Sequence, residues 1–316
     1  MNDTIDAPHA EGAAGQFNLS GVFAAALTPV GIDLSPDVAR HADHCRWLLK
    51  SGCDGLGVLG TTGEANSLSA AERIDVMEGL VKAGIPAEKI MPGTGCCSIV
   101  DSVVLAKKAL ELGCKGVLAL PPFYYKGVTD DGLFTVYSEI IERINDPRLR
   151  LYFYHFPAMS AVPISHDLIG RLRARYGDMV SGMKDSSGVV ENMTGAAHKN
   201  PGFEVFAGAD PALLPLMRDG GAGCITAACN VMPDVLADVY ANYKTDAAEK
   251  PHKLACAIRD IVTSVPLVGA LRALVARHRG DKTWACPLPP LMALNDNQRD
   301  ELFEKFDATG YKMPPL

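Results

Sequence analysis

The stretch "GLGVLGTTGEANSLSAAERIDVMEGLVKAGIPAEKIMPGTG", residues 55–95, contains the repeating unit that decides the fold. Two short apolar runs, at 55–60 and 90–95, flank a stretch of helical period at 69–84. The helical stretch opens with Ser69 and Glu72, which have the Ser-x-x-Glu spacing of a capping box. Continuous apolar runs of this length are typical of parallel strands buried on both faces. The stretch therefore predicts a strand, a helix and a second, parallel strand.

The same unit recurs along the chain. Apolar runs that predict strands lie at 21–29, 55–60, 90–95, 116–120, 149–156, 179–184, 203–208 and 222–227. Stretches of helical period follow them at 35–52, which opens on Ser35-Pro36, and at 69–84, 99–112, 129–144, 165–175, 190–199, 210–219 and 232–243. Strand–helix pairs repeated in this way predict a (β/α)8 barrel, an α/β fold. A doubly wound open sheet is the alternative, but it usually carries a glycine-rich phosphate fingerprint, and the first predicted strand ends in "LTPVG".

Three segments are expected. Residues 1–20 are polar and have no apolar core, which predicts a flexible tail and not a signal peptide. Residues 21–249 would form the barrel. Residues 250–316 contain further helical stretches, including 265–278 and 295–306, with no linker before them. We expect them to form a C-terminal helical appendage that packs on the barrel.

Composition limits the partners and the compartment. The chain has 316 residues, 48% of them apolar, and a net charge of −7, which fits a globular protein with a sizeable core. It shows no basic stripe and no membrane-length apolar run, so neither nucleic acid nor a membrane is expected as a partner. The nine cysteines include no Cys-x-x-Cys pair, which favours reduced thiols in a cytoplasmic protein.

A lysine at the end of a predicted strand raises the first question about chemistry. In "SGMKDSSG", residues 181–188, Lys184 follows an apolar approach and precedes Asp185. Only a neutral amine attacks a carbonyl, so a nucleophilic lysine needs a buried site without a counter-ion. Successive strand residues point to opposite faces, so Asp185 should not neutralise the amine. A salt-bridged structural lysine is the alternative.

Other strand ends carry hydroxyl groups. "GTTGE", Gly60 to Glu64, could cradle a small carboxylate with two hydroxyls and its backbone amides, or it could be an ordinary turn that caps the next helix. Tyr154 ends the strand at 149–156, where its hydroxyl could relay protons or its ring could simply pack. A barrel gathers these strand ends at one mouth, where active sites of this fold lie.

Taken together, these motifs resemble the class I aldolase and lyase family that contains dihydrodipicolinate synthase and N-acetylneuraminate lyase. The resemblance covers roughly residues 20–310. It rests on "GTTGE" after the second strand, Tyr154-x-x-Pro157 after the fifth and "GMKDSSG" after the sixth. "FAGADPALL" and "GGAGCITAACN" match the signatures of the seventh and eighth strands.

The resemblance implies a mechanism without a metal or an organic cofactor. Lys184 would form a Schiff base with pyruvate or another 2-keto acid, Thr61 and Thr62 would hold its carboxylate, and Tyr154 would relay protons. Tyr124 resembles a tyrosine that reaches in from a neighbouring subunit, with Tyr125 as the alternative, and a homotetramer built from dimers is implied. The pocket lining would include Gly60, Gly208 and Ile225.

The same motifs also bear on the substrate. The synthase usually presents an arginine two residues after the proline, and this chain has Met159. The sialic acid lyase usually has Asp-Glu after the seventh-strand glycine and a serine after the eighth strand. This chain has Asp210-Pro211 and Ala227 there. We expect a 2-keto-3-deoxy sugar acid or a related 4-hydroxy-2-keto acid, cleaved or dehydrated, whose hydroxyls contact Asp210 and Ser160. Condensation of pyruvate with aspartate semialdehyde is the alternative, and Lys126 could then bind its carboxylate.

Two alternative hypotheses are a metal enzyme and a binding protein without catalysis. His41, His44 and Cys45 lie on one helical stretch and could hold a metal, but this helix should be outside the barrel and a packing cluster is the simpler interpretation. His155 should point away from the barrel interior. A non-catalytic keto-acid-binding protein is the second rival, which the presence of both Lys184 and Tyr154 disfavours.

Overall fold

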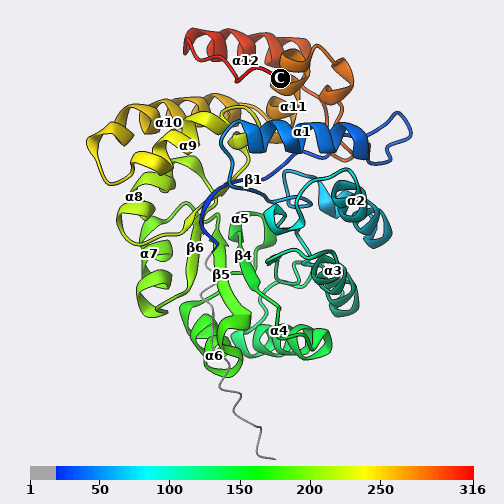
Figure 1. Ribbon diagram of the computed structural model, residues 1–316, viewed down its shortest axis with the longest axis vertical. Helices are drawn as coiled ribbons and strands as arrows, with labels where there is room; N and C mark the ends of the chain where they lie inside the picture. Colours follow the sequence, from blue (N-terminus) through cyan, green and yellow to red (C-terminus); the bar gives the residue numbers. More distant parts are fainter. Residues whose placement is uncertain (1–18) are drawn as a thin grey trace, which may run out of the picture.

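The computed structural model describes residues 19–316, which form a barrel of parallel strands surrounded by helices (Figure 1). Seven strands pair in parallel in the order β2-β1-β7-β6-β5-β4-β3. Their bounds are β1 Gly21–Ala24, β2 Gly55–Leu56, β3 Val117–Ala119, β4 Leu151–His155, β5 Val180–Asp185, β6 Glu204–Ala207 and β7 Gly223–Thr226. The predicted (β/α)8 fold is confirmed, and the open-sheet alternative is not.

The predicted strand at 90–95 closes the barrel without being a regular strand. Ile90 bridges to Leu56 of β2, and Gly93 bridges to Leu118 of β3, both in parallel. The amide of Gly93 donates to Val58 O at 2.8 Å, and the amide of Leu118 donates to Pro92 O at 2.9 Å. Proline has no amide hydrogen, so the ladder is interrupted inside this segment. The segment takes the place of the eighth strand in the barrel. It is not a regular strand, so the prediction of a full strand there was wrong.

The helices follow the predicted ranges closely. Their bounds are α1 Val38–Lys50, α2 Ala70–Lys82, α3 Ile99–Leu112, α4 Asp130–Ile144, α5 Pro157–Ser160, α6 His166–Tyr176, α7 Val190–Lys199, α8 Leu213–Arg218, α9 Pro233–Asn242, α10 Glu249–Thr263, α11 Leu267–Arg279 and α12 Asp296–Ala308. The capping box at Ser69 and Glu72 is present. The first helix begins later than Ser35-Pro36, because the side chain of Asp37 provides its N-cap. The range 210–219 begins as a 3-10 turn and becomes α-helical at Leu213.

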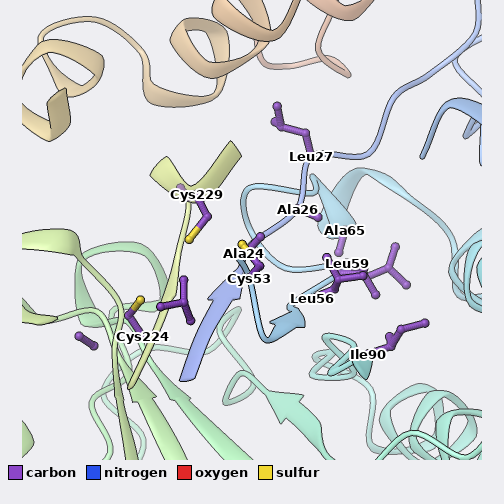
Figure 2. Close-up of a cluster of buried hydrophobic side chains, with 14 of the residues drawn as sticks. Ala24, Ala26, Leu27, Cys53, Leu56, Leu59, Ala65, Ile90, Cys224 and Cys229 are labelled. Carbon is purple, nitrogen blue, oxygen red and sulfur yellow. The ribbon is translucent and has the colours of Figure 1, made fainter. Parts of the chain in front are cut away.

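Alternation along the strands separates two cores. Inside the barrel lies a small cluster that includes Phe23, Tyr152, Tyr154, Phe206 and Ile225. The alternate residues face the helices and join a much larger core. Figure 2 shows part of this larger core, with Ala24 from β1, Leu56 from β2, Cys224 from β7 and Ile90 brought together. Side chains at inward positions near the strand ends therefore face the mouth of the barrel.

Helices α10, α11 and α12 lie together at the top of Figure 1, near α9 and α1. Helix α10 packs against α9, and α11 and α12 pack against α10. Arg272 of α11 and Glu64 of the turn after β2 form a fully buried ion pair, which ties this helix to the mouth of the barrel. The division of the chain at residues 249/250 stays a prediction. Most of the predicted tail, residues 1–18, lies outside the described residues.

In the part of the chain that the structure describes, no single helix has the length and apolar content needed to cross a membrane. Helices α10 and α11 reach these limits only when taken together, and they meet at a bend of 108°.

Candidate active site

An amine and two hydroxyls meet at the mouth of the barrel. Lys184 is inward-facing on β5, paired with Tyr154 of β4 on one side and Phe206 of β6 on the other. Its Nζ donates to the Tyr154 hydroxyl at 3.1 Å and lies 4.2 Å from the centre of the tyrosine ring. The same hydroxyl lies 3.2 Å from Oγ1 of Thr61. The Tyr154 hydroxyl thus connects the lysine to the turn after β2.

Among the described residues, no carboxylate forms an ion pair with the amine of Lys184. Asp185 follows Lys184 on β5 but faces the helices, where it accepts hydrogen bonds from the amide of Ser187 at 2.7 Å and from Asn192 Nδ2 at 2.6 Å. Lys184 is only 4% exposed. The described hydrogen-bond partner of this buried amine is therefore a tyrosine hydroxyl and not a counter-ion.

The turn after β2 places both threonines at the site. Thr61 and Thr62 line the same cavity as Lys184. Gly63 allows the turn to approach the segment that follows β1, since a Cβ there would lie 2.9 Å from Ala26 O. Glu64 points away from the cavity and accepts from Arg272 Nε at 2.7 Å. From the sequence, the turn was considered either as a cradle for a carboxylate or as a cap of the next helix. The side chain of Glu64 serves neither purpose, because it anchors α11 and makes no hydrogen bond that caps the following helix.

The cavity has a volume of about 250 Å³ and is closed in part by the C-terminal helices. Its lining comprises Thr61, Thr62, Tyr154, Phe156, Met159, Lys184, Ser186, Gly208, Ala209, Ala227, Arg259, Pro266, Leu267, Val268, Gly269, Leu291 and Met292. The sequence did not single out Phe156, Ser186, Arg259 or the segments 266–269 and 291–292 as site residues. A barrel motif marks strand ends, whereas these segments come from loops and from the appendage.

The proposed specificity residues are placed differently from one another. Met159 lines the cavity and is 61% exposed. Ser160 is buried, and its hydroxyl donates to Phe156 O at 3.0 Å and to Val162 O at 3.1 Å, so it serves the backbone of α5. Asp210 is fully buried and accepts from Thr226 Oγ1 at 2.5 Å. Neither Ser160 nor Asp210 lines the cavity, which weighs against direct contact with substrate hydroxyls.

The backbone positions are divided as well. Gly208 lines the cavity, and a Cβ there would lie 2.7 Å from Asp185 O, so glycine permits the close approach of two strand ends. Gly60 lines a smaller neighbouring recess beside Thr61 and Tyr154. Ile225 packs in the small cluster inside the barrel, below the mouth. Ala227, two residues later, takes the place at the cavity that was expected for Ile225.

The loop after β3 stays outside this cavity. Tyr124 and Tyr125 are each 72% exposed, and their rings contact each other edge to face at 5.3 Å. Lys126 donates to Ser160 O at 3.0 Å and to the carbonyl of Phe123. The amine of Lys126 is therefore occupied by backbone carbonyls, and the residue does not line the cavity.

The histidines considered for a metal lie in packed surroundings. His41, His44 and Cys45 are buried on the inner side of α1, and His44 Nε2 lies 2.8 Å from Asn230 Oδ1. Burial lowers the pKa of His44 to about 3 and that of His41 to about 4, so both rings are neutral. His155 faces away from the barrel interior, and its Nδ1 accepts from the amide of Ile164 at 3.0 Å. Among the described residues, no group of three or more His, Cys, Asp or Glu side chains could hold a metal ion.

The sequence model of the Dihydrodipicolinate synthetase family matches residues 18–309 of this chain. The chain belongs to the dihydrodipicolinate synthetase family. Its family match spans the whole barrel and nearly all of the C-terminal appendage, so the resemblance inferred from the motifs is confirmed. Members of this family are lyases and aldolases, and this chain is an enzyme of that type.

Individual relatives within the family agree. A DapA-like lyase of Chloroflexus aurantiacus is 31% identical over 88% of this chain and 93% of its own length. The 4-hydroxy-tetrahydrodipicolinate synthase of Neisseria meningitidis serogroup B is 32% identical over 70% of this chain and 74% of its own length. The crystal structure of dihydrodipicolinate synthase from Agrobacterium tumefaciens superposes with a TM-score of 0.86 at 29% identity, over 92% of this chain and 99% of that one.

Proposed function

We propose that this enzyme is a class I lyase in which Lys184 forms a Schiff base with pyruvate or another 2-keto acid. The observation that carries the proposal is the buried amine of Lys184, which faces a small-molecule cavity and bonds to the Tyr154 hydroxyl at 3.1 Å. A neutral amine adds to the C2 carbonyl, the carbinolamine loses water, and the protonated imine then accepts electrons from a bond to C3. No metal or organic cofactor is needed for that step.

Tyr154 and Thr61 would move the protons. The carbinolamine needs one proton delivered to its departing hydroxyl, and aldol cleavage needs one removed from the C4 hydroxyl of the substrate. The Tyr154 hydroxyl contacts both Nζ of Lys184 and Oγ1 of Thr61, so it can exchange a proton on either side. Thr61 and Thr62 supply hydroxyls for the keto-acid carboxylate. Protonation of the enamine at C3 and hydrolysis then release pyruvate and restore the amine.

The proposed substrate is a 2-keto-3-deoxy sugar acid or a related 4-hydroxy-2-keto acid. Met159 supports this choice because it presents an apolar side chain to the cavity where the synthase pattern has an arginine. Condensation of pyruvate with aspartate semialdehyde is the second candidate, favoured by the synthase among the relatives. A keto-acid-binding protein without turnover is not favoured, because family members are enzymes.

We expect kcat/KM for a 2-keto-3-deoxy sugar acid to exceed that for aspartate semialdehyde with pyruvate by roughly tenfold to a hundredfold. The physical reason is the loss of a charge-assisted contact worth about 1.5–3 kcal/mol where Met159 stands. The measurement is steady-state kinetics with both substrates on the same preparation. A higher value for the semialdehyde would identify the chain as a divergent synthase.

We also propose a cytoplasmic homotetramer, assembled as a dimer of dimers. All nine cysteines are free, as expected for a reducing compartment. Tyr124 and Tyr125 are exposed in the single chain, where a subunit interface would cover them and could deliver one ring to a neighbouring cavity. Sedimentation velocity should give a mass about four times that of the chain. A fully active monomer at assay concentration would refute the assembly and the role of Tyr124.

A further inference from the structure

A guanidinium from outside the barrel reaches the cavity. Arg259 lies on α10, in the C-terminal appendage, yet it lines the same cavity as Lys184. Its side chain is 20% exposed, so most of it is withdrawn from water. No barrel strand or strand-end motif points to this residue. Its place follows from the packing of α10 against the 3-10 turn that begins at Asp210.

The donors of Arg259 are poorly used. It faces the carboxylate of Asp210, with 3.6 Å between Nη1 and Oδ2, which is beyond a normal hydrogen bond. Nη1 of Arg259 and Oδ2 of Asp210 are both buried and have no hydrogen-bond partner in the described part of the chain. Burial raises the pKa of Asp210 to about 6, and the charge of Arg259 opposes that rise. A buried donor without an acceptor is costly, and a planar guanidinium with five donors has capacity for a ligand.

The described lining of the cavity contains basic side chains and no acidic one. Of the described residues in its lining, Lys184 and Arg259 are the basic ones, Arg259 keeps its charge at any ordinary pH, and none is an aspartate or a glutamate. Met159 and the segments around Leu267 and Met292 add apolar surface. The keto-acid carboxylate is assigned to Thr61 and Thr62, beside the lysine. Arg259 is the remaining basic side chain in this lining for a second anionic group on the same substrate.

We propose that Arg259 binds a second carboxylate, at the end of the substrate away from the keto group. This rests on the proposed function, since it describes the other end of the molecule held by Lys184. A guanidinium pairs with a carboxylate through two parallel hydrogen bonds. A phosphate dianion fits less well, because Asp210 already offsets part of the arginine charge and the rest of this wall is apolar. The substrate class is thus a 4-hydroxy-2-keto diacid.

The test compares three substrates that differ at the far end. One is 4-hydroxy-2-ketoglutarate, the second is the analogue that ends in a hydroxymethyl group, and the third ends in a phosphate ester. We expect the native enzyme to prefer the diacid over the hydroxymethyl analogue by roughly tenfold to a hundredfold in kcat/KM. Arg259→Gln should lower this ratio to near one, with the loss mainly in KM. Lys253→Gln, which removes an exposed positive charge from the same helix, is the matched control and should keep the ratio.

Each other outcome overturns a defined part of the proposal. If the native enzyme does not prefer the diacid, the whole proposal is wrong, and no variant is needed to show this. A preference for the phosphate ester would show that the site binds a phosphate and not a carboxylate. An unchanged ratio in Arg259→Gln would show that Arg259 does not bind the second carboxylate. Borohydride trapping with pyruvate alone separates this from the proposed function, because a missing adduct refutes the Schiff base whereas a normal adduct without diacid preference refutes the assignment of Arg259.

Discussion

Lys184→Ala is expected to lose the covalent adduct that the native enzyme forms with pyruvate and borohydride, and to lower turnover by about 10⁴-fold or more. Removing a nucleophile that forms the covalent intermediate has effects of that order in enzymes. Among the described residues that line the cavity, Lys184 is the only lysine, and Arg259 is the other basic residue. Intact mass should show one adduct of reduced pyruvate per native chain and none in the variant. Peptide mapping should place the adduct on Lys184.

Tyr154→Phe is the matched comparison because it keeps the amine and the aromatic ring. Only the hydroxyl that bonds Lys184 at 3.1 Å and Thr61 at 3.2 Å is removed. Turnover should fall by roughly a hundredfold or more, the scale of general acid–base assistance, while the adduct still forms at a lower rate. An adduct on another lysine, or activity retained in Lys184→Ala, would refute the nucleophile. Near-normal kinetics in Tyr154→Phe would refute the relay.

The barrel was predictable from sequence because buried parallel strands leave continuous apolar runs. The segment at 90–95 was harder, since its apolar run matches a strand but Pro92 cannot donate to the ladder. Helix starts were predictable where a capping side chain was recognised, as at Ser69. The start of α1 was misplaced because Asp37, and not Ser35, caps the helix.

The site could be predicted only where a strand fixes the direction of a side chain. Alternation on β5 separates Lys184 from Asp185, and pairing places Tyr154 beside the lysine. Asp210 lies in a turn beyond a strand, where the alternation of side chains along a strand no longer predicts the direction of its carboxylate. It is buried against Arg259, a residue 49 positions later on another element. Contacts of that kind depend on how the appendage packs, which local sequence patterns do not encode.

The second large effect concerns stability and arises from the same appendage. Glu64 and Arg272 are both fully buried, and their ion pair joins the turn after β2 to α11. Arg272 also donates to Thr28 O at 2.7 Å, and the amide of Leu288 donates to Glu64 Oε2 at 2.5 Å. Every oxygen of the carboxylate therefore has a donor within the core. Such a pair is costly to break, because the remaining charge is left buried and unpaired.

Arg272→Met should lower the free energy of unfolding by about 3–5 kcal/mol, and Glu64→Gln should also be strongly destabilising. The double variant should lose at least about 2 kcal/mol less than the sum of the two single losses, since the second substitution removes the charge that the first left unpaired. Arg299→Ala breaks exposed ion pairs with Asp296 and Asp300 and should cost about 1 kcal/mol or less. Urea denaturation of the four variants measures all of these values. Additive losses for Glu64 and Arg272 would show that the two residues act independently. Coupled losses, together with a raised KM in the single variants, would show that the pair holds the helix beside the cavity in place.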